Sequence, residues 1–308
     1  MSIAVDIGAT NIRAASGTED GFDRKLVENT DKDNGPEGVS VQIIRMINKL
    51  GVKPEVVGVG SIGPLNVHEG VITNTPNYPF KNIHIVKPLV EAFNVPVLLL
   101  NDCGAAVIGE QRFGRGKRID DLFYVTISTG LGGGAIVDGH PLKGKDGNAP
   151  EIGHIVVDPW SEIVCGCGCR GHWEAFSSGA NMPNYARHIV RRYKLSSSIL
   201  FKEAGSCLEN LNSEMIFTAA RGGDDTARKI VDEIAEINAV GFADIVNVFD
   251  PELITVGGSV ALSNPDLVLE PIRLKINKYL INRCPEIVIT PLSGDIVLYG
   301  ALAAILGR

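Results

Sequence analysis

The chain has 308 residues, 44% of them hydrophobic and 6% aromatic, and it carries a formal net charge of −7. This length exceeds what one hydrophobic core usually supports, so two domains are expected. The acidic balance argues against a nucleic-acid partner, because a phosphate backbone is met by a basic face. No signal-peptide pattern follows Met1 and no stretch reaches the length of a bilayer span, so a cytoplasmic protein without a membrane partner is expected.

The first half of the chain alternates apolar strands with helical patterns. Strands are predicted at residues 2–7, 12–16, 56–61 and 97–100, and helices at 37–50 and 103–110. All-apolar strands separated by helices indicate a largely parallel sheet covered by helices, so the expected fold class is α/β.

The second half opens by repeating the start of the chain. A basic, glycine-containing link at 113–118 leads to a strand at 122–127 and a glycine-rich turn, as in residues 3–16. This echo predicts a duplicated α/β architecture with a boundary near residue 113. The predicted elements beyond it are a loop-rich stretch at 139–172, helices over 213–250, strands at 253–256 and 287–291, and a helix at 300–306.

The first glycine turn follows the first strand and contains Asp6, Gly8, Thr10 and Asn11. Glycine lets the backbone approach an anion, Thr and Asn supply donors, and Asp6 is a candidate for holding a Mg²⁺ that bridges phosphate oxygens. A hairpin turn with a capping Asp and no ligand is the alternative for this motif taken alone.

The second glycine turn, residues 128–134, is the stronger signal. Small and hydroxyl-bearing residues directly after a buried strand leave amides free to cradle phosphate. No Gly-Lys-Ser/Thr follows, so this is not a Walker loop, and a strand rather than a helix is expected next, which excludes the dinucleotide pattern. A hairpin without a ligand is the alternative. Together the two turns point to a nucleotide held by two lobes.

Asn101 and Asp102 end an otherwise apolar strand. Ligands of open α/β sheets bind at the carboxyl ends of parallel strands, so Asp102 is the candidate base that accepts a proton from an attacking hydroxyl. The alternative is that the pair only caps the following helix.

Three cysteines fall within five residues, Cys165, Cys167 and Cys169, with His154 and His172 nearby. Thiols and imidazoles at this spacing match a closed, tetrahedral, structural zinc site, although spacing alone leaves open which two thiols bind. Free structural thiols are the alternative. A zinc-fixed loop would present Glu151, His154 and Glu174 to one small polar ligand such as a sugar.

These motifs together resemble the ROK family of sugar kinases over essentially the whole chain. The resemblance rests on Glu-x-Gly-His at 151–154 and Cys-x-Cys-Gly-x-x-Gly-x-x-Glu at 165–174. It implies a two-lobed actin/hexokinase-like (ribonuclease H-like) fold with a duplicated mixed sheet and a zinc-stabilised loop. The expected small lobe is 1–112 plus a C-terminal helix at 297–308, and the expected large lobe is 113–296.

The resemblance also assigns roles to individual residues. It implies that ATP phosphates bind at Asp6, Gly8, Thr10, Asn11, Ser128, Thr129, Gly130, Gly132 and Gly133, with Gly257 and Gly258 on the adenosine side. It implies catalysis by Asp102 and sugar contacts at Asn77, Asn101, Asp102, Glu151, His154 and Glu174.

Two positions depart from the family pattern. His172 stands where the zinc knuckle usually ends in cysteine, so the implied ligands are His154, Cys165, Cys167 and His172, with Cys169 free. Ala149-Pro150 replaces the usual Ala-Gly before Glu151, which stiffens that loop.

The expected reaction is ATP-dependent phosphorylation of the 6-hydroxyl of a hexose or N-acetylhexosamine, with Mg²⁺ on the phosphates. The His-substituted knuckle favours N-acetylmannosamine as the acceptor, with glucose next and a non-catalytic sugar sensor as a further alternative. A repressor is not expected, since Asp6 leaves no room for a preceding helix-turn-helix domain. The resemblance implies a homodimer or homotetramer.

Overall fold

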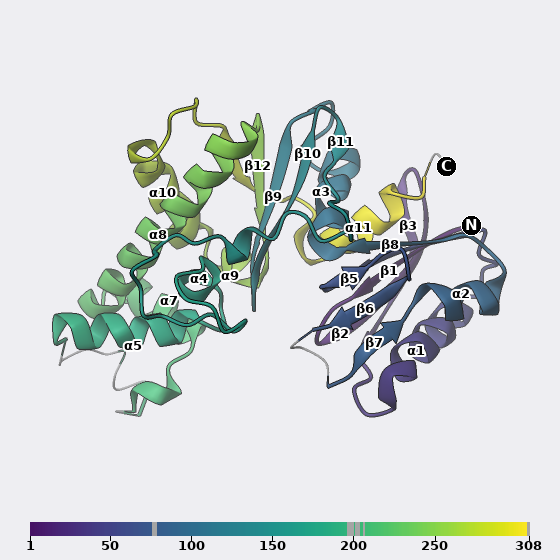
Figure 1. Cartoon of the computed structure of the whole chain (residues 1–308), viewed down its shortest axis with the longest axis horizontal. Helices are drawn as coiled ribbons and strands as arrows, with labels where there is room; N and C mark the ends of the chain where they lie inside the picture. Colours follow the sequence, from purple (N-terminus) through teal and green to yellow (C-terminus); the bar gives the residue numbers. More distant parts are fainter. Residues whose placement is uncertain (76–78, 196–199, 201–203, 206, 307–308) are drawn as a thin grey trace. The chain divides into compact units, whose positions relative to one another are not determined.

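The computed structural model describes residues 1–75, 79–195, 200, 204–205 and 207–306, which form two compact units (Figure 1). The first unit comprises Met1–Tyr124, Gly134–Pro150 and Thr290–Arg308, and the second comprises Val125–Gly133 and Glu151–Ile289.

These units differ from the expected lobes, 1–112 with 297–308 and 113–296. Residues 113–124, 134–150 and 290–296 pack with the first unit rather than with the second. Close backbone approach is one physical reason, because a Cβ on Gly134 would lie 2.1 Å from the carbonyl oxygen of Cys103.

The first unit is built on a five-stranded sheet of order β3-β2-β1-β4-β8. Its strands are β1 (Ser2–Ile7), β2 (Asn11–Thr18), β3 (Gly21–Asn29), β4 (Val56–Ser61) and β8 (Val97–Asn101). β1, β4 and β8 run parallel, while β2 and β3 continue from β1 as antiparallel hairpins. The four predicted strands of this region are confirmed. β3 has no predicted counterpart because its charged residues hide the apolar alternation.

Two sets of helices cover the two faces of this sheet. The helices of the unit are α1 (Gly35–Lys49), α2 (Val86–Phe93), α3 (Asp102–Phe113) and α11 (Ile296–Ala303), with the 3-10 turn η4 (Ser293–Asp295). Ile3 and Val5 are buried in one core cluster with the apolar face of α1, whereas Ala4 is buried in another with α11. A small residue on β4 permits the close approach of α11 to this face, since a Cβ on Gly58 would lie 2.2 Å from the Ala301 oxygen.

A three-stranded antiparallel sheet also belongs to the first unit. It consists of β5 (Leu65–Asn66), β6 (Val71–Asn74) and β7 (Lys81–His84). These strands are short, and the sequence pattern does not predict them.

The second five-stranded sheet has the order β11-β10-β9-β12-β13. Its strands are β9 (Leu122–Ile127), β10 (Leu131–Val137), β11 (His140–Pro141), β12 (Leu253–Gly257) and β13 (Glu286–Ile289). The predicted strands at 122–127, 253–256 and 287–291 are confirmed, and β9 and β10 repeat the strand–turn–strand order of β1 and β2.

Outside its strands, the second unit is mainly helical. Its helices are α4 (Glu174–Ser177), α5 (Met182–Tyr193), α7 (Ser213–Arg221), α8 (Asp225–Phe249), α9 (Ser259–Ser263) and α10 (Pro265–Lys275), with the 3-10 turns η1 (Ile152–His154), η2 (Leu208–Asn210) and η3 (Ile276–Lys278). Helices are confirmed over the predicted stretch 213–250, and side-chain caps explain where α7 and α8 begin: Asn212 accepts the Met215 amide at 2.9 Å, and Asp224 accepts the Ala227 amide at 2.8 Å.

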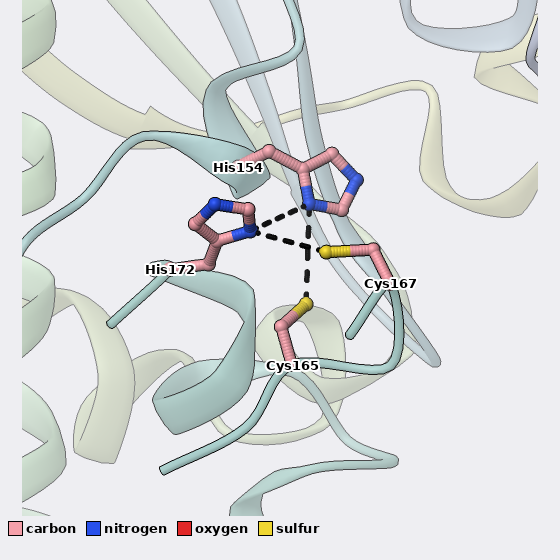
Figure 2. Close-up of side chains that lie close together, drawn as sticks. All are labelled: His154, Cys165, Cys167 and His172. Atoms are coloured by element: carbon pink, nitrogen blue, oxygen red, sulfur yellow. Dashed lines mark hydrogen bonds between the residues drawn. The ribbon is translucent and has the colours of Figure 1, made fainter. Parts of the chain in front are cut away.

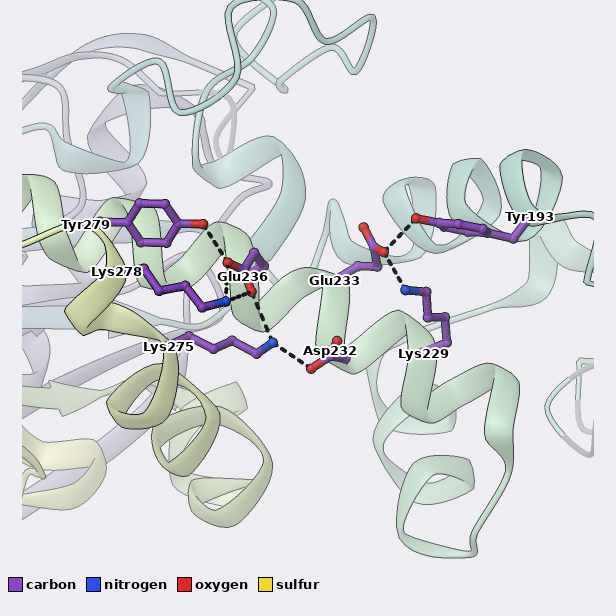
Figure 3. A network of polar contacts seen from close by, with 8 residues as sticks. All are labelled: Tyr193, Lys229, Asp232, Glu233, Glu236, Lys275, Lys278 and Tyr279. Atoms are coloured by element: carbon purple, nitrogen blue, oxygen red, sulfur yellow. Dashed lines mark hydrogen bonds and ion pairs between the residues drawn. The ribbon is translucent and has the colours of Figure 1, made fainter.

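Ion pairs tie the middle of α8 to its neighbours (Figure 3). Glu236 accepts bonds from Lys275 at 3.1 Å, from Lys278 at 3.0 Å and from the Tyr279 hydroxyl at 2.5 Å. One turn earlier, Glu233 accepts the Tyr193 hydroxyl at 2.8 Å. Glu236 thus links α8 to α10 and to the segment at η3, and Glu233 links it to α5.

Across the described part of the chain, no helix combines the length and the apolar character needed to cross a membrane.

Candidate active site and metal centre

The first glycine turn is a β-hairpin closed by its own backbone. The Gly8 amide donates to the Asn11 oxygen at 3.0 Å, and the Thr30 hydroxyl donates to the Gly8 oxygen at 2.8 Å. Asp6 precedes the turn on β1, opposite Arg13 on β2. Thr10 is exposed, so the turn presents small and polar groups at the end of the strand.

Asp6 is buried and carries an unusual charge environment. Arg13 Nη1 lies 2.6 Å from Asp6 Oδ2. Burial nevertheless raises the pKa of Asp6 to about 6, because desolvation outweighs the guanidinium. The negative charges of Asp102 and Asp295 raise this pKa further. Asp102 and Asp295 thus lie near enough to Asp6, within the first unit, for their charges to affect its pKa.

Asn101 and Asp102 lie where three parallel strands end side by side. The strand register pairs Ile7 with Ser61 and Ser61 with Asn101. Asn101 Oδ1 caps α3 by accepting the amides of Cys103 at 3.0 Å and Gly104 at 3.3 Å. The capping interpretation of the sequence is thus confirmed for Asn101. Asp102, the half-buried first residue of α3, lies beside the edge of the sheet where ligands of α/β folds bind, and its Oδ1 also accepts the Cys103 amide, at 2.7 Å.

Two further residues that the sequence analysis did not single out converge on Asn101. A Cβ on Gly63 would lie 3.1 Å from Asn101 Nδ2 and 3.5 Å from Asn148 Oδ1. The Leu65 amide donates to Asn148 Oδ1 at 2.7 Å, and Asn148 Nδ2 donates to the Leu65 oxygen at 2.8 Å. Asn148 comes from a polar loop without periodicity, so no sequence signal reveals it. The next peptide in this loop, Ala149-Pro150, is cis.

Asn77, the remaining expected sugar contact of the first half, lies outside the described residues.

The second glycine turn is held by a distant segment of the chain. The Ser128 amide donates to the Gly130 oxygen at 2.9 Å, which makes the turn. The Leu131 amide donates to Glu174 Oε2 at 2.9 Å, and the Gly179 amide donates to the Ser128 oxygen at 2.7 Å. Thr129 is exposed at the tip, while Gly132 and Gly133 continue into β10. Glu174, expected to bind sugar, thus also contacts the expected phosphate turn.

The Gly257-Gly258 pair lies next to this turn. Gly258 has a φ of +87°, and a Cβ there would lie 2.4 Å from the Ile127 oxygen, so only glycine fits the end of β12 against β9. The hydroxyls of Ser128 and Ser259 are 3.0 Å apart. Ser259 was not singled out from the sequence, although a hydroxyl after a Gly-Gly pair is the signal that identifies it.

Four side chains form a cluster of metal-ligand type, His154, Cys165, Cys167 and His172 (Figure 2). Their ligand atoms all lie within 4.8 Å of one another. His154 Nδ1 is 3.2 Å from His172 Nδ1 and 3.9 Å from Cys165 Sγ, and Cys167 Sγ is 3.3 Å from His172 Nδ1. Cys165 is buried and Cys167 is exposed.

These distances fit a tetrahedral ion. Zinc–nitrogen and zinc–sulfur bonds of ordinary length place neighbouring ligand atoms roughly 3.3–3.8 Å apart. The chemistry of the donor set, two thiols and two imidazoles, also suits zinc. Cys169 is exposed and lies outside the cluster, and its backbone oxygen accepts the Cys165 amide at 2.8 Å.

His154 is the last residue of the 3-10 turn η1, and Glu151 directly precedes this turn. His154 directs Nδ1 toward the other three ligands (Figure 2), so Nε2 is on the opposite side of the ring. Glu151 is the N-cap residue of this turn, and its side chain is exposed. A metal bound at the cluster would fix the His154 ring through Nδ1 and leave Nε2 to meet a hydroxyl.

Comparison with known proteins adds to this geometry. The model of the ROK family matches residues 2–303. A glucokinase of Pyrobaculum calidifontis is 39% identical over 98% of this chain and 93% of its own length. An N-acetylmannosamine kinase of Escherichia coli is 31% identical over 87% and 86%, respectively. The crystal structure of a ROK family glucokinase from Streptomyces griseus, in complex with glucose and AMPPNP, aligns with a TM-score of 0.77 at 31% identity and covers 98% of both chains.

Proposed function

Since the chain belongs to the ROK family and is a sugar kinase, we propose that it transfers the γ-phosphoryl group of ATP to the 6-hydroxyl of glucose. The observation that carries this proposal is Asp102, a half-buried carboxylate at the end of β8 beside Asn101, in a family of sugar kinases.

Asp102 is the proposed general base. As the 6-oxygen of the sugar attacks the γ-phosphorus in line, its proton passes to the Asp102 carboxylate, and the bond from phosphorus to the bridging oxygen breaks to release ADP. Phosphoryl transfer needs little covalent assistance, so the main work of the protein is to position the reactants and stabilise charge. The cap formed by Asn101 fixes the first turn of α3 and, with it, the backbone of Asp102.

The two glycine turns are the proposed phosphate contacts. The turn with Gly8, Thr10 and Asn11 offers small and polar groups, and the turn with Ser128 and Thr129 offers an amide-rich backbone next to Gly258. Asp6 would hold a hydrated Mg²⁺ through its carboxylate, which also forms an ion pair with Arg13. When bound, Mg²⁺ neutralises phosphate charge in the transition state.

Glucose is the proposed acceptor in place of the N-acetylmannosamine favoured by the histidine-containing knuckle. The glucokinase relative is 39% identical to this chain and the N-acetylmannosamine kinase is 31% identical. N-acetylmannosamine stays as the alternative acceptor, because both relatives cover most of the chain.

The cluster of two cysteines and two histidines is the proposed zinc site. Zinc there would have a structural role, because all four tetrahedral positions are taken by protein ligands. It would fix the loop that carries His154 and Glu174, two of the proposed sugar contacts.

The test is ADP release from Mg·ATP with glucose as the acceptor. The proposal expects turnover with glucose and none with 6-deoxyglucose, which lacks the attacking oxygen. If 6-deoxyglucose were phosphorylated with release of ADP, the 6-hydroxyl would be excluded as the acceptor of the phosphoryl group. Absence of turnover by the folded, zinc-loaded protein with both glucose and N-acetylmannosamine would contradict the assignment of either acceptor.

A further inference from the structure

A short segment of the second unit contacts the second glycine turn through residues at the start of α4 and after its end. This bracket, defined as residues 172–180, contains the metal-cluster residue His172, the helix α4 and the two residues that pair with the turn. The Leu131 amide donates to Glu174 at the start of α4 at 2.9 Å. After α4, the Gly179 and Ala180 amides donate to the oxygens of Ser128 at 2.7 Å and Thr129 at 3.2 Å.

Glu174 lies directly against the turn. A Cβ on Gly130 would lie 2.9 Å from Glu174 Oε2, so the carboxylate fills the space where a side chain at position 130 would begin. On the other side of the same residue, a Cβ on Gly153 would lie 2.0 Å from the Leu131 carbonyl oxygen. The Leu131 residue is therefore confined by Glu174 at its amide and by Gly153 at its carbonyl.

The bracket itself is anchored in the core. Trp173 is fully buried, and its indole nitrogen donates to Asn238 of α8 at 2.8 Å in a buried hydrogen bond. The neighbouring Glu174 therefore starts from a fixed backbone, and little conformational freedom remains to be lost when its carboxylate holds the turn.

The bracket also adjoins the cluster of four candidate metal ligands. His172 precedes Glu174 by two residues, and Cys165 Sγ lies 3.5 Å from Glu174 Oε1. One carboxylate thus contacts a candidate metal ligand through one oxygen and the second glycine turn through the other.

We propose that Glu174 is a positioning residue for the phosphoryl donor, through which the metal-cluster loop sets the Ser128–Leu131 turn. This role is separate from any contact of Glu174 with the sugar. The inference depends on the proposed function, because it assumes that a nucleotide binds at this turn.

The test is the dissociation constant of a non-hydrolysable ATP analogue, measured calorimetrically without sugar. Glu174→Ala should weaken nucleotide binding by about tenfold or more, since a hydrogen bond to a charged acceptor is lost. Glu174→Gln keeps an acceptor at the same distance and should bind within about threefold of the parent. A residue that only contacts sugar would leave this constant unchanged, so Glu174→Ala binding within about twofold of the parent would overturn the proposal.

Glu174→Asp provides a second, more conservative variant. It retains the charge, but its carboxylate is one methylene shorter and cannot reach the Leu131 amide. It should therefore bind nucleotide as weakly as Glu174→Ala, and it bears the test alone if Glu174→Ala does not fold. Parent-like binding by Glu174→Asp would overturn the proposal.

The connection to the metal cluster has its own experiment. Cys167→Ser should lose zinc and weaken nucleotide binding in the parent, but have little further effect in the Glu174→Ala background. Cys169→Ser is the matched control and should change neither zinc content nor nucleotide binding. Equal weakening by Cys167→Ser in both backgrounds would show that the carboxylate does not couple the two sites. Failure of the parent itself to bind nucleotide would instead contradict the proposed function.

Discussion

The two glycine turns follow equivalent strands but are supported in different ways. The first, between β1 and β2, is closed by the Gly8–Asn11 backbone bond and is held further by Thr30, which bonds Gly8 and Thr10; the adjacent strand pair contains the buried ion pair of Asp6 and Arg13. The second, between β9 and β10, depends on amide and carboxylate contacts from residues more than forty positions away, at Glu174 and Gly179.

The difference shows that one sequence pattern can serve two tasks. Near the first turn, Asp6 and Asp102 are the proposed magnesium ligand and proton acceptor. The second turn offers backbone amides, and we propose that its shape depends on the loop that contains the candidate metal ligands. Changes near the first turn should therefore affect chemistry and charge, whereas changes near the second should affect nucleotide affinity.

The largest expected effect is that of Asp102→Asn, beside the first turn. Removal of the general base should lower kcat by about 10²–10⁴-fold and leave the dissociation constants of sugar and nucleotide nearly unchanged. Steady-state kinetics combined with calorimetry measures both. Asp23→Asn, at an exposed position on β3, is the control and should keep parental kcat. A variant at position 102 with more than about a tenth of parental kcat would contradict a general-base role.

The next effect concerns the support of the second turn. Metal analysis should find about one zinc per chain in the parent and in Cys169→Ser, and almost none in Cys167→Ser. The loss of the ion should also lower the thermal midpoint of Cys167→Ser, because metal binding stabilises the folded loop. A folded parent without zinc, or equal zinc in the two serine variants, would remove the metal from this account.

A smaller effect is expected from the buried charge of Asp6. Its folded-state pKa of about 6 lies above the ordinary 3.8, so the folded protein binds the proton more tightly than the unfolded chain. The contribution of this residue to stability therefore falls as pH rises from about 4 to 6, by at most about 3 kcal/mol. Asp6→Asn should gain stability relative to the parent over that range. Urea unfolding at pH 4.5 and pH 7 measures the difference, and a constant offset would contradict a raised pKa.

The smallest effect is expected far from both turns, at Glu236. Its bonds to Tyr279, Lys278 and Lys275 lower its pKa to about 2, so its contribution is complete above about pH 4.5 and is lost as pH falls toward 2. Glu236→Gln should cost about 0.5–1 kcal/mol at neutral pH, since the pairs are partly exposed to solvent. Denaturant unfolding should show no such loss for Glu252→Gln, a change at an exposed position. Equal stability of the two variants at pH 7 would show that the network contributes nothing.

The sequence could predict the elements whose signal is local. The strands at 2–7, 56–61, 97–100 and 122–127 are apolar and bounded by turn residues, so their pattern identifies them. The cap at Asn101 follows from its residue type at the end of a strand. The thiols and imidazoles between residues 154 and 172 indicate a metal site, although only the family resemblance selects His154, Cys165, Cys167 and His172 as its ligands.

The rest depends on contacts between distant residues. The three short strands from Leu65 to His84 are stabilised by pairing and not by their own periodicity. Asn148 acquires its place beside Gly63 and Leu65 only through the folding of a polar loop. The hydrogen bond from the Leu131 amide to Glu174 joins residues 43 positions apart, so no local sequence pattern could reveal it.

The most direct test of the proposed acceptor is the ratio of kcat/KM for glucose to that for N-acetylmannosamine, measured by ADP release on one preparation of the zinc-loaded parent. We expect a ratio well above one, with glucose as the preferred acceptor. A ratio well below one would contradict it and restore N-acetylmannosamine, the acceptor that the histidine in the zinc knuckle favours.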